Sequence, residues 1–461
     1  MDLTVQTFLT VLESLPRAER YLIAYSGGLD SHVLLHLCAA IGNAGWRSEF
    51  AAMHVHHGLQ PDAERWSEHC AATCARLGIP FRLIRVDATA TPGQSPEEAA
   101  RNARYAALKS GIGRGECVLT AQHRDDQAET MLLQVFRGGG LAGLSAMPTS
   151  AVLGPGMLQR PLLAFSRDSI EAYAKAHQLA WVEDPSNRNK AYDRNFLRHE
   201  VMPLLKQRWP GVVKAVRRSA GHCAEAKALI DGVGESLYRS VKNPADGTLN
   251  LGRLQELDLA ARRLALRVWI RHHGLRMPSA NIIQRILGEV STARPDGSPR
   301  VCWSEAEIRR FRDRLYLLPR LTELEPGFSC DWDGKTPLAL PDGNGRLEVF
   351  KTDRIGISPR LWHNGPITVR YRQGGESCRL PGRQGRHKLK NLFQERAVPP
   401  WVRERVPLIY IGDELAAIGG LWVCAPFLGE GEGRDLTLRW SDHGLYGKAM
   451  TRSEMSTKIA H

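Results

Sequence analysis

The heptapeptide YSGGLDS, Tyr25 to Ser31, decides the fold of the N-terminal part of the chain. It stands between an apolar run at 20–26 and a segment whose apolar residues are spaced as on one face of a helix. A glycine turn that joins a strand to a helix gathers backbone N–H groups, which bind an anion without a charged side chain. Gly27 and Gly28 suit such a turn because glycine accepts positive φ. The stretch lacks the lysine of the P-loop, G-x-x-x-x-G-K-[ST], so it predicts a different anion site.

Outside this turn, strand-like and helix-like segments alternate. Between the apolar runs lie stretches with apolar residues three and four apart, which predicts βαβ units. The fold class that follows is α/β, with an N-terminal doubly wound, mostly parallel sheet. Ligands of such sheets bind beyond the carboxyl ends of the strands. The four apolar runs lie at 20–26, 49–57, 80–88 and 116–123.

The pattern changes further along the chain. From about Gly211 the segments have the periodicity of amphipathic helices, which predicts a small helical domain. From about Pro326 short strand-like pieces predict a small α+β C-terminal domain. The predicted domains are a catalytic domain at 1–215, a helical middle domain at 216–325, a basic C-terminal domain at 326–441 and a loose tail at 442–461.

Composition narrows the class of protein. The chain has 461 residues, 43% of them hydrophobic and 24% charged, as expected of a soluble globular protein. No apolar run is long enough to span a membrane, and no signal peptide is recognisable. Nine cysteines without a framework favour free thiols and a cytoplasmic location.

The net charge is +13, and residues 351–410 hold 13 Lys or Arg against 4 Asp or Glu. This surplus indicates either a solvated basic face or a nucleic-acid surface.

Three polar clusters follow the predicted strands. The first is HVHHGLQ at 54–60, and the second is the pair Arg101 and Arg104 on one helix face. The third runs from Gln122 to Glu129 at the start of a helix, where the helix dipole favours carboxylates. Each cluster alone has an ordinary explanation as an ion pair, a helix cap or a hydrogen-bonded surface group. Their shared position at one sheet edge, beside an anion-binding turn, favours a functional site.

The turn resembles the signature of the PP-loop, or N-type, ATP pyrophosphatases. Members of this superfamily cleave ATP between the α and β phosphates and adenylate a substrate. The resemblance implies an adenine nucleotide alpha hydrolase-like fold, with ATP as substrate and Mg²⁺ as cofactor. It also implies that the loop binds the pyrophosphate of ATP through Ser26, Gly27, Gly28, Leu29, Asp30 and Ser31.

Further segments are similar to the tRNA(Ile)-lysidine synthetases. They are EDPSN at 183–187, RNFLRHEVMPLLKQRWP at 194–210 and the basic stretch at 380–423, so the resemblance covers nearly the whole chain. The chain departs from the usual family pattern at three positions. His56 stands where Asn is common, Gln60 where Arg is common, and Gln122 where His is common.

The resemblance implies a reaction. These enzymes join free L-lysine to C2 of the wobble cytidine in the CAU anticodon of a minor tRNA(Ile). ATP first adenylates the cytidine oxygen, and the lysine amine then displaces AMP. The product, lysidine, pairs with A instead of G and changes the tRNA from methionine to isoleucine identity.

The resemblance also implies roles for single residues. Asp30 would orient Mg²⁺, Arg101 and Arg104 would stabilise charge at the α-phosphate, and Asp126 and Glu129 would hold the lysine ammonium. The attacking amine must lose a proton, and His123 is the predicted acceptor. The predicted tRNA-binding residues are Arg383, Arg386, Lys388 and Lys390.

Two other functions are also compatible with the sequence. A PP-loop tRNA thiolase would adenylate a base but deliver sulfur, and Cys70 and Cys74 are the nearest approach to its cysteine pair. A non-catalytic RNA-binding protein on the same fold would need no intact loop. The sequence does not fix the oligomeric state, and a homodimer is compatible with it.

Overall fold

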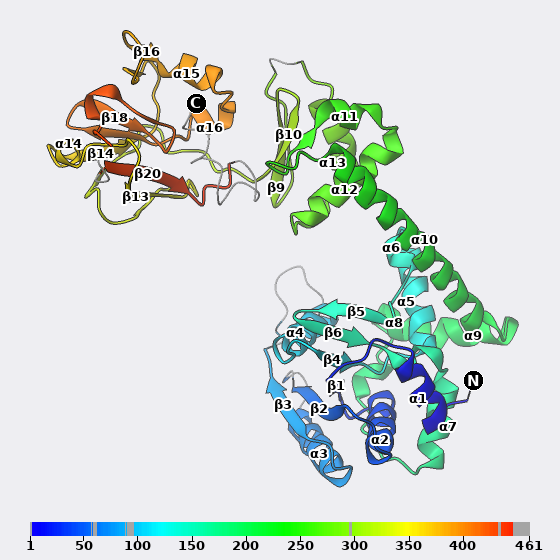
Figure 1. Cartoon of the computed structure of the whole chain (residues 1–461). Helices are drawn as coiled ribbons and strands as arrows, with labels where there is room; N and C mark the ends of the chain where they lie inside the picture. Colours follow the sequence, from blue (N-terminus) through cyan, green and yellow to red (C-terminus); the bar gives the residue numbers. More distant parts are fainter. Residues whose placement is uncertain are drawn as a thin grey trace. The chain divides into compact units, whose positions relative to one another are not determined.

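The computed structural model describes residues 2–56, 58, 62–87, 89, 96–294, 297–431 and 435–445. The chain forms two compact units, Met1–Ile230 and Asp231–His461 (Figure 1). The long helix α10, Val212–Val241, contains the point of division. The finer division into four domains stays a prediction.

The first unit is built on a six-stranded sheet of order β3-β2-β1-β4-β6-β5. Neighbouring strands are parallel except β5 and β6, which form an antiparallel hairpin at one edge. The predicted doubly wound, mostly parallel sheet is therefore confirmed. Its strands are β1 (Arg20–Ala24), β2 (Glu49–His56), β3 (Phe81–Arg85), β4 (Glu116–Leu119), β5 (Ser150–Leu153) and β6 (Gly156–Gln159).

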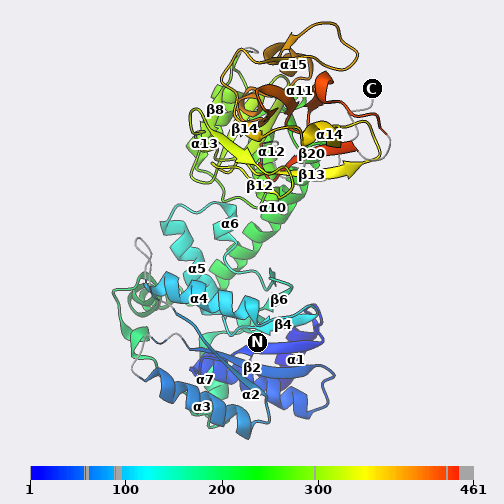
Figure 2. The same cartoon turned by 90° about the vertical axis from the view of Figure 1, so that its left-hand side faces the viewer.

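Helices cover both faces of this sheet, because side chains on both faces of the central strands are apolar and buried. One face packs against α1, α2, α3 and α7, and the other packs against α4 (Figure 2). The helices of this unit are α1 (Val5–Glu13), α2 (Leu29–Asn43), α3 (Ala63–Arg76), α4 (Pro96–Ser110), α5 (Arg124–Phe136), α6 (Leu141–Leu144), α7 (Arg167–Ala176), α8 (Asp193–Phe196) and α9 (Met202–Arg208).

Helices α8 and α9 form one helical run that is interrupted by a wider turn. The turn, Leu197–Val201, has π-helical hydrogen bonding. Pro203 follows in the first turn of α9 and supplies no backbone N–H, so the regular hydrogen-bond ladder cannot continue through it. The side chain of Arg198 therefore projects from an irregular turn.

The second unit begins with helices that pack on a small antiparallel sheet, β7-β10-β9-β8. The sequence predicted only helices at 216–325, so this sheet is a finding of the structure. Its elements are α11 (Leu251–Glu256), α12 (Leu259–His272), α13 (Ala280–Arg285), β7 (Leu249–Asn250), β8 (Arg300–Cys302), β9 (Ala306–Phe311) and β10 (Arg314–Pro319).

The rest of the second unit confirms the predicted α+β class. A five-stranded sheet, β11-β14-β17-β18-β19, and a three-stranded sheet, β12-β13-β20, share one apolar core that includes Trp401. Trp401 is buried, so it is a core residue. The elements are β11 (Ser329–Trp332), β12 (Leu338–Ala339), β13 (Arg346–Thr352), α14 (Pro359–Trp362), β14 (Ile367–Arg370), β15 (Ser377–Cys378), β16 (His387–Lys388), α15 (Leu389–Glu395), α16 (Pro400–Arg403), β17 (Leu408–Ile411), β18 (Glu414–Ile418), β19 (Trp422–Val423) and β20 (Asp435–Ser441).

Two predictions about the chain as a whole can be compared with this fold. Within the described ranges, no helix is both long and apolar enough to cross a bilayer. All nine cysteines are free thiols. Most of the predicted tail, from residue 446 on, lies outside the described residues.

The close packing around Gly27 can be tested by substitution. Gly27 has φ +84°, and an added Cβ would lie 3.0 Å from Cys70 Sγ on α3. Gly45 has a similar φ of +91°, but an added Cβ would meet no atom within 4 Å. Gly45→Ala should therefore cost only the strain of positive φ, about 1 kcal/mol. Gly27→Ala should cost clearly more, because the thiol is buried and cannot move away. Denaturant unfolding of both variants measures the difference, and equal losses would refute the argument.

Candidate active site

The loop at 26–31, called the glycine loop below, closes on itself through two serines. Ser31 Oγ accepts a hydrogen bond from Ser26 N–H at 3.2 Å and lies 3.0 Å from Ser26 Oγ. Ser31 also donates to the carbonyl of Gly28 at 2.9 Å. Gly28 is the N-cap of α2 and makes no side-chain cap, so the N–H groups of the first turn are left for a ligand.

The segment EDPSN lies against this loop, which explains why the two motifs occur in one chain. Val182 N–H, directly before EDPSN, donates to the carbonyl of Gly27 at 3.0 Å. Asp184 accepts from Ser186 N–H at 2.9 Å and so fixes the turn at Pro185. Asn195 Nδ2, on α8, donates to the carbonyl of Ser186 at 2.9 Å. The loop, the EDPSN turn and the helical run at 193–208 are thus one connected structure.

Asp30 extends from the first turn of α2 toward α7. Its two oxygens lie 3.1 and 2.9 Å from Arg167 Nη1. The same guanidinium donates through Nε to Glu171 at 2.9 Å, and the backbone N–H of Arg167 donates to Asp125 at 2.9 Å. Arg167 therefore joins the starts of α2, α5 and α7.

The predicted acidic cluster lies at the start of α5, directly after β4. His123 is the N-cap: its Nδ1 accepts from Asp126 N–H at 3.4 Å, and Asp126 Oδ2 accepts from His123 N–H at 3.0 Å. Asp125, Asp126 and Glu129 are all buried in the first two turns of the helix. The sequence argument correctly placed these carboxylates together at the C-terminal edge of the sheet.

Every carboxylate of this cluster has a cationic partner. Arg194 donates through Nε to Glu129 at 3.0 Å and through Nη2 to Asp126 at 3.1 Å. Arg198 donates to Glu129 at 2.7 Å and to Asp126 at 2.8 Å. Lys206 Nζ donates to Asp125 at 2.7 Å. The helical run at 193–208 thus neutralises the acidic start of α5, and we call this set the ion-pair cluster.

Burial and pairing compete in setting the pKa values here. Burial alone would raise the pKa of Asp126, but His123, Arg194 and Arg198 outweigh it and hold that pKa below its usual value. Burial would lower the pKa of Arg198, whereas Glu129 and Asp126 raise it above the usual value. For Asp30 burial wins over His123 and Arg167, and its pKa is raised. The lowered pKa of Asp126 and the raised pKa of Arg198 both favour the charged forms of this pair.

His123 lies behind the carboxylates. It is 1% exposed, and its Nε2 is 3.3 Å from Asp126 Oδ2 and 3.8 Å from Asp30 Oδ2. Nδ1 accepts the capping bond, and the buried Nε2 has no hydrogen-bond partner among the described residues. The ring is thus fixed on one side by the helix cap, and its other nitrogen lies close to two carboxylates.

Other predicted residues lie around this edge. Arg101 and Arg104 lie on α4, and the guanidinium of Arg101 lies 4.9 Å above the ring of Tyr105. Burial and the charge of Arg101 lower the pKa of Arg104, and the charges of Tyr105 and Asp184 offset part of this. His54 is buried, and its Nδ1 lies 2.8 Å from the Tyr25 carbonyl.

The structure describes two of the three residues that depart from the family pattern. His56 Nε2 is 3.5 Å from Glu64. Gln122 has a buried Oε1 without a hydrogen-bond partner among the described residues. Gln60 lies outside the described residues.

The described part of the chain offers no group of three or more His, Cys, Asp or Glu residues that could hold a metal ion. A protein cage for Mg²⁺ is therefore not formed by these side chains alone. Mg²⁺ bound to ATP needs only one or two carboxylates besides the phosphates. Asp30 belongs to the glycine loop itself, but as a ligand it would have to share its oxygens with Arg167.

The predicted tRNA-binding residues gather in the second unit. They lie on the hairpin β15–β16, in its loop and at the start of α15. Arg383 pairs with Glu395 at 2.8 Å, and Arg386 donates to Ser377 at 3.2 Å. Lys388 and Lys390 are exposed, and no ion pair of the described residues involves either of them.

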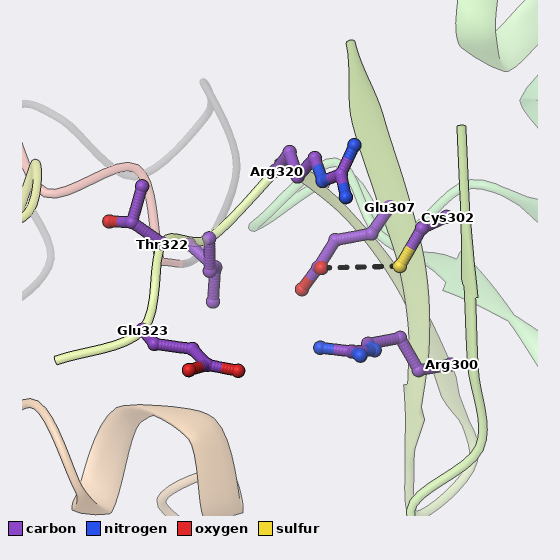
Figure 3. Close-up of a pocket in the computed structure, with 7 residues that line it drawn as sticks. Arg300, Cys302, Glu307, Arg320, Thr322 and Glu323 are labelled. Atoms are coloured by element: carbon purple, nitrogen blue, oxygen red, sulfur yellow. Dashed lines mark hydrogen bonds between the residues drawn. The ribbon is translucent and has the colours of Figure 1, made fainter. Parts of the chain in front are cut away.

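A hollow of about 320 Å³ lies elsewhere in the second unit (Figure 3). Cys302 Sγ donates to Glu307 at 3.6 Å on one wall, and Arg320 and Glu323 come from the chain after β10. Because the wall mixes both signs of charge and contains no predicted ATP-binding residue, we do not assign the nucleotide to it.

Known proteins resemble this chain along most of its length. Residues 1–205 match the family model of the PP-loop domain, 249–316 the TilS substrate binding domain and 367–440 the TilS substrate C-terminal domain. The tRNA(Ile)-lysidine synthase of Methylococcus capsulatus is 45% identical over 91% of this chain and 96% of its own. That of Coxiella burnetii is 42% identical over 93% and 95%. The chain belongs to the tRNA(Ile)-lysidine synthase family.

A solved structure was also found for comparison. The U34-tRNA thiolase NcsA from Methanococcus maripaludis, with its [4Fe-4S] cluster, has 16% sequence identity to this chain. The match covers 48% of this chain and 79% of NcsA, with a TM-score of 0.41.

Four residues of the site were not predicted from the sequence. They are Arg167, Arg194, Arg198 and Lys206. Arg194, Arg198 and Lys206 occur in the segment 194–210, which was noted only as part of the resemblance. Arg167 lay outside every quoted motif. The spacing of Arg194 and Arg198, four residues apart, was the available signal, since it places both on one helix face. No such signal marked Lys206 or Arg167.

The ion-pair cluster predicts a pH-dependent loss of stability. In Asp126→Asn the shape is kept, but two guanidinium groups lose one of the two anions that they share, so unfolding at neutral pH should become easier by about 3 kcal/mol. Because the pKa of Asp126 is lowered, its contribution is complete above the ordinary value of 3.8 and is lost as the pH falls below it. The difference between the two proteins should therefore shrink below that pH.

Asp193→Asn is the matched control, because Asp193 pairs with Arg137 in a surface contact of 3.4 Å. It should change stability little at any pH. Denaturant unfolding from neutral to acid pH measures all three proteins. A loss of stability in Asp126→Asn that stays constant with pH would contradict the prediction.

Proposed function

We propose that the protein uses ATP to ligate free L-lysine to C2 of the wobble cytidine in the CAU anticodon of a minor tRNA(Ile). The observation that carries the proposal is the intact glycine loop beside a buried carboxylate cluster, in a chain 45% identical over 91% of its length to a tRNA(Ile)-lysidine synthase. The loop suits an anion and the cluster suits a cation. The reaction needs both, since its substrates are ATP and a lysine ammonium.

The proposed reaction has two steps. The C2 oxygen of the cytidine attacks the α-phosphate of ATP, the bond between the α and β phosphates breaks, and pyrophosphate leaves. The lysine ε-nitrogen then forms a bond to C2, the bond from C2 to the bridging oxygen breaks, and AMP leaves with that oxygen. The lysine nitrogen loses its extra proton in this step.

Residues 26–31 would hold the pyrophosphate through backbone N–H groups and the serine hydroxyls. Arg101 and Arg104 remain our candidates for stabilising charge at the α-phosphate. The charge of Asp184, in the EDPSN turn, acts on Arg104. Mg²⁺ carried by ATP would neutralise phosphate charge, and Asp30 is its candidate ligand.

Asp126 and Glu129 remain the candidates for the lysine ammonium, but the structure adds a condition. Their oxygens already accept hydrogen bonds from Arg194 and Arg198. An incoming ammonium must share these oxygens or replace a guanidinium. Phosphate oxygens bind guanidinium strongly and bidentately, so bound ATP would draw the arginines away from the carboxylates. This would couple ATP binding to the opening of the lysine site.

The proton acceptor for the lysine amine is not His123 in this proposal. Its ring already caps α5 through Nδ1. We propose instead that His123 positions the Asp126 and Asp30 carboxylates, which lie within 3.8 Å of its Nε2.

The basic hairpin region of the second unit would hold the tRNA. Such contacts position the nucleic acid through its phosphates. A cytoplasmic location agrees with free thiols and a tRNA substrate. A homodimer stays a prediction, which size-exclusion chromatography with light scattering would test.

The thiolase reading loses support from the structure. Cys70 and Cys74 are fully buried on α3, and burial raises the pKa of each thiol to about 12. A thiol in that state is protonated at neutral pH and is a poor nucleophile. Cys70 instead packs behind Gly27.

Lysine transfer tests the proposal directly. Purified protein would be incubated with ATP, Mg²⁺, labelled lysine and a CAU-anticodon tRNA(Ile) transcript. We expect label at the wobble cytidine and one AMP per lysine, with neither in Asp30→Ala. Asp168→Ala is the matched control, since Asp168 is exposed at the start of α7 and has no hydrogen bond or ion pair from its side chain among the described residues; it should keep activity.

The alternative outcomes separate the readings. AMP release without lysine transfer, or transfer to tRNA(Met) as readily as to tRNA(Ile), would contradict the proposal. Tight tRNA binding without any AMP release would favour a non-catalytic RNA-binding protein.

The basic hairpin predicts an effect on tRNA affinity alone. Lys388→Gln and Lys390→Gln each remove an exposed charge, so each should weaken tRNA binding a few-fold and lower the salt dependence by about one ion. Lys335→Gln, an exposed lysine on a different turn of the same unit, is the control. Filter binding at several salt concentrations measures these effects. A change in lysine transfer at saturating tRNA would contradict a purely binding role.

A further inference from the structure

The glycine loop lacks the fixed cation that a P-loop carries as its lysine. Its own side chains are two hydroxyls, a leucine and the carboxylate of Asp30. Backbone N–H groups carry only partial charge, whereas a departing pyrophosphate carries several negative charges. A positively charged side chain beside the loop would therefore favour the step in which pyrophosphate leaves.

Arg167 is the cation that contacts this loop directly. Nη1 is held by both oxygens of Asp30, at 2.9 and 3.1 Å, and Nε by Glu171 at 2.9 Å. No hydrogen bond among the described residues engages Nη2. The side chain is 34% exposed, so solvent and ligand can reach it. The two carboxylates thus fix the guanidinium while one nitrogen remains available.

The N-terminal turns of the surrounding helices also favour an anion beside Arg167. The backbone of Arg167 is fixed as well, because its N–H donates to Asp125. The first turns of α2, α5 and α7 meet around these contacts, through Asp30, Asp125 and Arg167. Three helix N-termini place positive dipole ends at one point. A guanidinium held there is preorganised, so little ordering is needed when a phosphate arrives.

We propose that Arg167 is a phosphate-binding residue of the ATP site, which binds the pyrophosphate group through Nη2 while Asp30 and Glu171 hold the guanidinium in place. This inference deepens the function proposed above and rests on it for the reaction. In this arrangement Asp30 serves the phosphate through Arg167, in place of acting only as a metal ligand. The competing explanation is that Arg167 merely ties α7 to α2.

Direct binding of pyrophosphate separates these explanations. Titration calorimetry with Mg²⁺-pyrophosphate on the full chain needs neither tRNA nor lysine. Arg167→Gln should weaken binding about 10- to 100-fold, because a charge-assisted hydrogen bond is lost. Arg20→Gln is the control: Arg20 is also a partly exposed, ion-paired arginine, 3.5 Å from Glu116, but it begins β1 at the opposite edge of the sheet. It should leave the affinity unchanged within about twofold.

A second variant distinguishes binding from stability. Arg167→Lys keeps a positive charge but cannot span Asp30 and Glu171, so it should regain part of the pyrophosphate affinity without regaining thermal stability. Glu171→Gln loosens the guanidinium at its far end and should weaken binding only slightly. A folded Arg167→Gln that binds pyrophosphate like the wild type would overturn the inference. So would affinities that follow the melting temperatures of the variants.

Lysine transfer by the wild-type protein, measured in parallel, tells the two proposals apart. Transfer together with pyrophosphate binding that ignores Arg167 would overturn this inference and leave the proposed function standing. Pyrophosphate binding that depends on Arg167 without lysine transfer would support this inference and overturn the proposed reaction.

Discussion

The pairing of Asp126 and Glu129 with Arg194 and Arg198 is the interaction on which the rest of the first unit depends. Buried carboxylates at the end of β4 would be costly without cations, and two guanidinium groups from the helical run at 193–208 supply them. The same run carries Asn195, which holds the EDPSN turn against the glycine loop. A change in the ion pairs would therefore reach the loop through a short series of hydrogen bonds. The site is held together by charge as much as by the packing of the sheet.

The parts of this structure that depend on local sequence were predictable. The glycine turn, the alternation of strands and helices, and the carboxylates at the start of α5 each follow from neighbouring residues. The hairpin β5–β6 and the sheet β7-β10-β9-β8 were not predicted. The strands β9 and β10 were missed because residues 216–325 were interpreted as helical, whereas β5, β6, β7 and β8 have four residues or fewer. Such strands carry too few residues for a period to be recognised, and they depend on their partners in the sheet.

The partners of the predicted site residues could not be predicted, since they come from distant positions. Arg167 is 137 residues from Asp30, and Arg198 is 72 residues from Asp126. Sequence spacing says that Arg194 and Arg198 share a helix face, but it does not say which surface that face meets. The sequence alone therefore did not indicate that Asp126 and Glu129 are paired with arginines. The structure places these carboxylates and His123 together at the start of α5 and shows the partners of the carboxylates.

The two units differ in how strongly dissolved salt weakens the interactions of their charged residues. In the first unit, Asp126 and Glu129 are largely buried beneath arginines that are 25 to 30% exposed, so dissolved salt screens these pairs less than it screens exposed charges. In the second unit, Lys388 and Lys390 are exposed, and their attraction for a polyanion falls as the ionic strength rises. Under the proposed assignments, changes in ion concentration would alter how much RNA the exposed lysines hold, while the paired carboxylates beside the glycine loop would be affected little.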